Sequence, residues 1–73
     1  RGLDVSAVES IHKLIINQRD EGAAVLLISE DLDELFKLSD RIIVLYEGRI
    51  IKEVDIESAN IESLGLAMAG INE

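Results

Sequence analysis

Apolar residues recur near the start of the chain at the spacing of one helical face. They are Val8, Ile11 and Ile15. Ser6 and Glu9 stand where a capping box places them, with the hydroxyl and the carboxylate each reaching a backbone amide at the helix start. Gly22 tolerates the left-handed conformation found just past helix ends. The pattern predicts a helix over residues 6–21.

The next stretch, residues 23–28, is apolar without interruption. It is too short for a buried helix, and it suits a strand covered on both faces, as in parallel sheets. Ser29 has the side chain of a helix N-cap, and the acidic residues after it complement the positive end of a helix dipole. We therefore predict a strand over 23–28 and a helix over residues 30–40.

Two β-rich runs follow, residues 41–46 and residues 49–54. Glu47 and Gly48 separate them, and a two-residue connection that ends in glycine is typical of a tight hairpin. The sequence therefore predicts an antiparallel hairpin at this place.

Asn60 can cap a last helix, and Gly70 can end it. The predicted order is helix-strand-helix-strand-strand-helix, which is that of an α/β fold with a right-handed parallel crossover. A fully apolar strand at 23–28 needs a neighbour at each edge and a layer on each face. Because 73 residues barely supply these, we expect the chain to be one piece of a larger α/β domain.

The composition excludes several kinds of site and partner. The chain has no cysteine and a single histidine, His12, so thiolate and multi-histidine metal sites are excluded and no metal site is expected. We interpret His12 as a boundary or surface residue of its helix. Fifteen acidic and seven basic residues give a net charge of −8, which repels phosphate backbones and argues against nucleic acid as a partner.

Three blocks of the sequence together resemble the C-terminal part of an ABC-transporter ATP-binding subunit, which has the P-loop NTPase fold. The blocks are RGLDV (1–5), AVLLISEDLDE (24–34) and LSDRIIVLYEGRI (38–50). The resemblance is strongest to the second nucleotide-binding half of the tandem subunits of simple-sugar and nucleoside importers. It implies that residues 1–73 are a C-terminal fragment of one nucleotide-binding domain, with the D-loop, the H-loop region, the closing β-hairpin and the C-terminal helix.

The resemblance also assigns roles to particular residues. Gly2, Leu3 and Asp4 match the D-loop, which in the family lies at the interface between two nucleotide-binding domains. Glu30 occupies the position of the H-loop histidine that contacts the γ-phosphate of ATP. A carboxylate cannot donate a hydrogen bond to phosphate and repels its charge. Glu30 can be explained as an acidic residue at a helix N-terminus, and the departure also fits a second-half domain whose own ATP site is weakened.

The functional expectations follow from the resemblance. The parent subunit would use ATP and Mg²⁺ to drive sugar or nucleoside uptake, together with a partner nucleotide-binding domain and transmembrane permease subunits, at the cytoplasmic side of the membrane. The 73 residues contain no phosphate loop, no signature segment and no Walker B strand, so no catalytic residue is expected in the fragment. We expect the fragment alone to bind and hydrolyse no ATP, because hydrolysis needs those parts together.

The apolar sheet edge and the acidic surface each raise a further expectation. The fragment is expected to self-associate, because an uncovered apolar sheet edge is a pairing hazard. The alternative to a transporter fragment is a non-enzymatic acidic α/β protein-interaction module whose likeness to the D-loop is coincidental.

Overall fold

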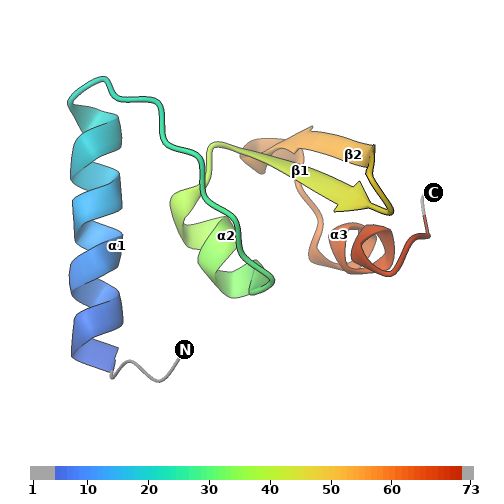
Figure 1. Cartoon of the computed structure of the whole chain (residues 1–73), viewed down its shortest axis with the longest axis horizontal. Helices are drawn as coiled ribbons and strands as arrows, with labels where there is room; N and C mark the ends of the chain where they lie inside the picture. Colours follow the sequence, from blue (N-terminus) through green and yellow to red (C-terminus); the bar gives the residue numbers. More distant parts are fainter. Residues whose placement is uncertain (1–4, 72–73) are drawn as a thin grey trace.

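The computed structural model describes residues 5–71, so the expected D-loop residues Gly2, Leu3 and Asp4 lie outside the described residues. Within the described part, the chain is a small α/β piece with a two-stranded sheet. The elements in chain order are α1 (Val5–Asp20), α2 (Leu32–Leu38), β1 (Arg41–Tyr46), β2 (Arg49–Asp55), the 3-10 helix η1 (Ile56–Ser58) and α3 (Ile61–Met68). Figure 1 shows α1 to one side, α2 in the middle, and the hairpin packed with α3 at the other side.

The first predicted helix is confirmed as α1, although its details differ from the prediction. It begins at Val5, so Ser6 lies inside the first turn and is not the N-cap that the capping-box pattern predicted. Ile11 and Leu14 are 44% and 64% exposed. The half-covered side of the helix is instead formed by Ala7, Val8, His12, Ile15, Ile16 and Arg19. The sequence carries apolar side chains on more than one face of this helix, and only one face is covered here.

The strand predicted over residues 23–28 was wrong for this chain. The segment connects α1 to α2 without belonging to a strand, and the sheet holds only β1 and β2 (Figure 1). Leu26 and Ile28 are 87% and 89% exposed. A strand requires a neighbouring backbone to pair with, and residues 5–71 place none beside this segment. The observed order is helix-helix-strand-strand-helix, and the predicted parallel crossover is not formed.

The acidic helix is α2, and it is shorter than the predicted 30–40. Its N-cap is Asp31, whose side chain accepts from the backbone amides of Asp33 and Glu34. The predicted cap, Ser29, instead accepts from the amide of Asp31 at 3.0 Å. Asp31 is better placed for capping because its carboxylate is a charged acceptor directly before the first turn.

The predicted hairpin is confirmed, and β1 pairs with β2 in antiparallel fashion. Glu47 and Gly48 form the turn, with φ values of 50° and 79°. Positive φ at both central residues is the geometry of a type I′ turn, whose twist matches that of the flanking strands. The pairing register shifts once, between Val44 and Leu45.

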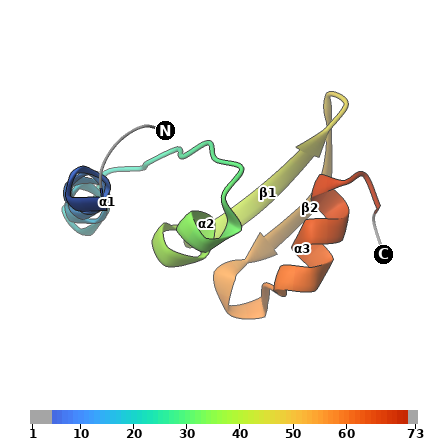
Figure 2. The ribbon, with the colours of Figure 1, turned by 90° about the horizontal axis from the view of Figure 1, so that it is seen from below.

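The core lies between the hairpin and α3, which lies along one face of the sheet (Figure 2). Ile42 and Val44 point from β1 toward Leu64 and Ala67 of α3, and both α3 residues are fully buried. Asn60 caps α3 as predicted, because its side chain accepts from the amide of Ser63 at 2.9 Å. None of the helices in the described part is long and apolar enough to cross a bilayer.

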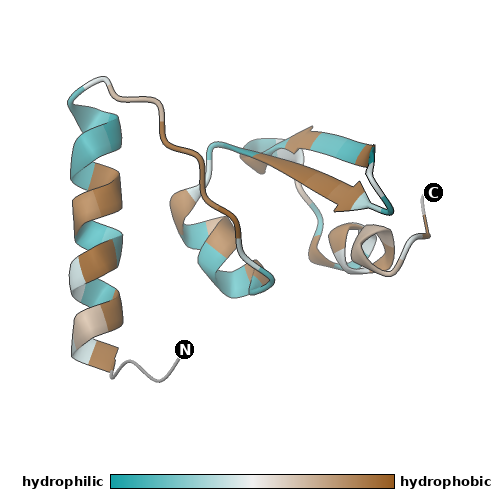
Figure 3. Cartoon of the chain, viewed as in Figure 1, coloured by the Kyte–Doolittle hydropathy of each residue, from teal (hydrophilic) through white to brown (hydrophobic). Residues whose placement is uncertain are grey.

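The opposite face of β1 is also apolar, yet it is open. Ile43 and Leu45 are 42% and 67% exposed. Figure 3 shows β1 hydrophobic between its two end residues and a second hydrophobic stretch in the connection before α2. A strand that is apolar on both faces is typical of a sheet covered by a layer on each side.

Gly70 ends α3 as predicted. Its amide donates to Ala67 O and the amide of Ile71 donates to Leu66 O, which is the Schellman pattern. Gly70 has φ of 89°, and a Cβ added there would meet the ring of Tyr46 at 2.7 Å. The position therefore requires glycine for two reasons. The backbone has positive φ, and the ring of Tyr46 occupies the space that a Cβ would need.

Two glycine substitutions in this region are expected to act in opposite directions. Gly70→Ala should lower the free energy of unfolding by about 1–3 kcal/mol, because it strains the backbone and collides with Tyr46. Gly65 lies inside α3, where an added Cβ meets nothing within 4 Å. Gly65→Ala should therefore raise the free energy of unfolding by up to about 1 kcal/mol. Urea unfolding followed by circular dichroism measures both, and equal effects would contradict the proposed role of Gly70.

Candidate functional site

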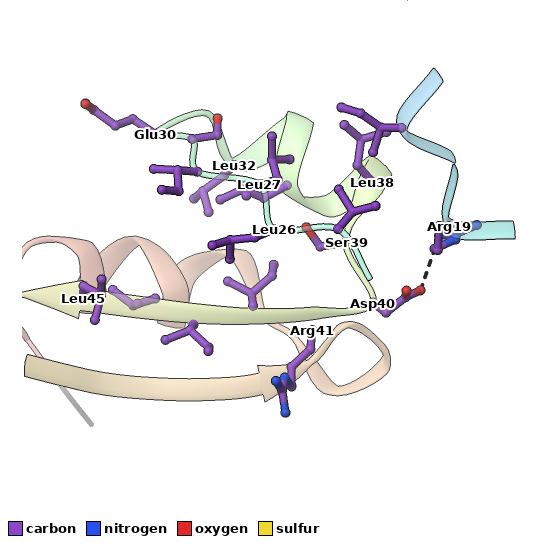
Figure 4. Close-up of a pocket in the computed structure, with 18 of the residues that line it drawn as sticks. Arg19, Leu26, Leu27, Glu30, Leu32, Leu38, Ser39, Asp40, Arg41 and Leu45 are labelled. Atoms are coloured by element: carbon purple, nitrogen blue, oxygen red, sulfur yellow. Dashed lines mark hydrogen bonds and ion pairs between the residues drawn. The ribbon is translucent and has the colours of Figure 1, made fainter. Parts of the chain in front are cut away.

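An open groove of about 870 Å³ lies between the 23–28 connection, α2 and β1. We call it the apolar groove. Most of its lining is aliphatic, including Leu26, Leu27, Leu32, Leu38 and Leu45 (Figure 4). The charged side chains stand toward its ends, with Glu30 at one end and Arg19, Asp40 and Arg41 at the other. Such a lining is suited to burying further apolar side chains and offers little to orient a charged nucleotide.

Glu30 lies in the turn before α2, and its side chain is exposed. A shallower hollow of about 680 Å³ lies beside this turn. Its lining consists of Val8, Ile28, Ser29, Glu30, Asp31 and Glu34, which include three carboxylates and no basic side chain. A triphosphate would meet repulsion at this turn. The residues around Glu30 therefore do not fit ATP.

The described residues also hold no cluster of three or more metal-binding side chains with the geometry of a metal site. A hard cation such as Mg²⁺ needs several oxygen ligands around one point. The acidic turn is therefore interpreted as the start of a helix whose carboxylates complement its dipole.

Sequence reasoning missed one polar contact near this turn. His12 of α1 lies 2.7 Å from Glu34 of α2, measured between Nε2 and Oε2, and the two side chains are only 19% and 27% exposed. The interpretation of His12 as a boundary residue agrees with this position, but the partner was not anticipated. Hydrogen bonds from Ser29 and then from His12 hold the pKa of the Glu34 carboxyl below its usual value of 4.5.

A second polar contact joins α1 to the far end of α2. Arg19 donates to Asp40 across 3.3 Å, as Figure 4 marks with a dashed line. Arg19 also contacts Asp20 beside it at 3.3 Å. The sequence signal for both links is the spacing on α1, because His12 and Arg19 are seven residues apart and so share one helical face.

The predicted site residues are thus not brought together within the described part of the chain. Glu30 stands at the mouth of the apolar groove, on the side of the 23–28 connection. Gly2, Leu3 and Asp4 lie outside the described residues. What the structure does assemble is an uncovered apolar groove and a paired contact between α1 and α2.

Comparison with known proteins finds relatives that match nearly the whole of this chain. A glucose import ATP-binding protein of Haloferax volcanii is 54% identical over 70 residues, which are 96% of this chain and 13% of the relative. A guanosine import ATP-binding protein of Bacillus subtilis is 56% identical over 70 residues, 96% of this chain and 14% of the relative. A nucleoside import ATP-binding protein of Lactococcus lactis is 51% identical over 72 residues, 99% of this chain and 14% of the relative.

The chain therefore spans about one seventh of the length of the curated relatives it matches, 13–14% in these three cases. No family model matches the chain. No solved structure matches it either.

Proposed function

We propose that the chain is the C-terminal part of an ATP-binding subunit of an ABC importer for sugars or nucleosides, because it is related to such subunits. It would belong to the second nucleotide-binding half, and residues 1–73 would supply the D-loop, the switch region, the closing hairpin and the C-terminal helix. The whole subunit would couple ATP binding and hydrolysis to uptake of a sugar or a nucleoside.

The observation that supports this most directly is the uncovered segment 23–28. Six consecutive apolar residues line a groove of about 870 Å³, and Leu26 is 87% exposed. Monomeric proteins rarely leave a large apolar patch exposed to water, so a patch of this kind usually marks a surface that another part of the protein or a partner covers. In a longer α/β domain, preceding strands would pair with 23–28 and fill the groove.

The residues of this chain take supporting roles in the proposal. Gly2, Leu3 and Asp4 would face the partner nucleotide-binding domain. Glu30 would stand at the switch position of a half-site that turns over slowly, because its carboxylate cannot donate to the γ-phosphate. ATP and Mg²⁺ would be held by parts of the subunit outside this chain, since the acidic turn does not fit them.

The partners follow from the same proposal. The subunit would pair with another nucleotide-binding domain and bind permease subunits at the cytoplasmic side of the membrane, as a peripheral protein. A non-enzymatic acidic interaction module is the alternative, and it needs neither ATP nor a permease.

The test uses the longer subunit that contains this chain, reconstituted with its permease in proteoliposomes. We expect ATP hydrolysis and ATP-dependent uptake of one member of a panel of labelled glucose, ribose and guanosine. A matched subunit that lacks residues 5–73 should lose both activities, because the groove and the hairpin complete the domain. A longer protein without ATPase activity would overturn the proposal and favour the interaction module.

A further inference from the structure

Helix α1 is attached to the rest of the chain with little apolar burial. None of its residues is fully buried, and Leu14 remains 64% exposed. Among helices and strands, α1 makes its main contact with α2. Because the hydrophobic contribution is small, the placement of α1 depends strongly on its polar contacts.

Those contacts occur at two well-separated points of one face. His12 and Arg19 are two helical turns apart, a rise of about 10.5 Å. Their partners bracket α2, because Glu34 lies in its first turn and Asp40 lies just beyond its end. One contact would leave α1 free to pivot, whereas two contacts at this separation fix its direction as well as its position.

We propose that the pairs His12–Glu34 and Arg19–Asp40 form a two-point clamp that makes α1 and α2 move as one body. The inference rests on the proposed function, which places Asp4 directly before α1 and Glu30 directly before α2. Through the clamp, a displacement of the switch segment would be passed to the D-loop and so to the partner domain. His12 is then a positioning residue, because it acts through the helices and not on the nucleotide.

The His12–Glu34 pair is the stronger of the two points. Its distance is 2.7 Å and both side chains are largely covered, whereas Arg19–Asp40 spans 3.3 Å and Asp40 is 75% exposed. Water and salt screen exposed pairs, so they contribute little. Removal of His12 should therefore release the clamp more fully than removal of Arg19.

The experiment is a double-mutant cycle in the longer subunit, with steady-state ATPase as the readout. His12→Leu is expected to lower kcat about fivefold and to leave the KM for ATP within about twofold, because positioning changes and binding does not. Glu34→Leu should cause a similar loss, and the double variant should lose no more than either single variant. His12→Gln should keep most of the activity, since its amide can still donate to Glu34.

Lys13→Leu is the matched control, because Lys13 is the exposed neighbour of His12 on the same helix. It should keep the parental kcat. The clamp would be overturned if the His12→Leu variant kept the wild-type ATPase activity, or if the losses of the two single variants added up in the double variant. Neither result would affect the proposed function. Absence of ATPase in the unmodified subunit would overturn the proposed function, and with it the transmission from switch to D-loop.

Discussion

Leu26→Asp is expected to leave the stability of the 73-residue chain almost unchanged and to prevent the proposed longer subunit from folding. Leu26 is 87% exposed in this chain, so an aspartate there meets water, and surface changes of this kind stay within about 0.5 kcal/mol. In the longer subunit the same position would lie in a strand covered on both faces. An unpaired carboxylate buried there should cost more than about 4 kcal/mol, which is a large part of a domain's total stability.

The measurements are urea unfolding of the chain and the soluble yield and thermal midpoint of the longer subunit. Asn17→Asp is the matched control, since it adds the same charge at an exposed position of α1, and both proteins should tolerate it. A longer subunit that folds normally with Leu26→Asp would show that segment 23–28 stays exposed there. That result would remove the main structural support for the proposed function.

The second large effect concerns the two carboxylates that the family resemblance singles out. We expect Asp4→Ala to lower the ATPase activity of the assembled transporter about tenfold more than Glu30→Ala, which corresponds to about 1.4 kcal/mol in barrier height. Asp4 would help to organise the ATP site shared with the partner domain, which still turns over. Glu30 would face its own half-site, where the donor histidine is already missing.

Steady-state ATPase of the purified variants measures this difference. Glu62→Ala is a suitable control, because it removes an exposed carboxylate from α3. Equal losses for Asp4→Ala and Glu30→Ala, or a larger loss for Glu30→Ala, would mean that the switch position still contributes to catalysis in this half.

Several local signals in the sequence were interpreted correctly, although the helix caps predicted at Ser6 and Ser29 were not. The hairpin follows from Glu47 and Gly48, both of which adopt positive φ. Asn60 and Gly70 begin and end α3 because each acts within one turn of its own position. The family resemblance was also right, since relatives 51–56% identical are import ATP-binding proteins.

The larger errors arise where the outcome depends on residues far away in the chain. Residues 23–28 have the composition of a strand, but a strand needs a partner that residues 5–71 do not supply. The covered face of α1 was misjudged because Ile11 and Leu14 are as apolar as the residues that α2 covers. The contact between His12 and Glu34 spans 22 positions, and the spacing of His12 and Arg19 on α1 does not by itself identify their partners.

The close approach of Gly70 to Tyr46 gives this chain a built-in optical reporter. Tyr46 is its single tyrosine and there is no tryptophan, so all fluorescence excited in the phenol absorption band comes from one ring. That ring lies at the tip of the hairpin and against the turn that ends α3. Emission intensity and its quenching by iodide therefore follow the docking of the C-terminal turn onto the hairpin, without a label and separately from the state of α1.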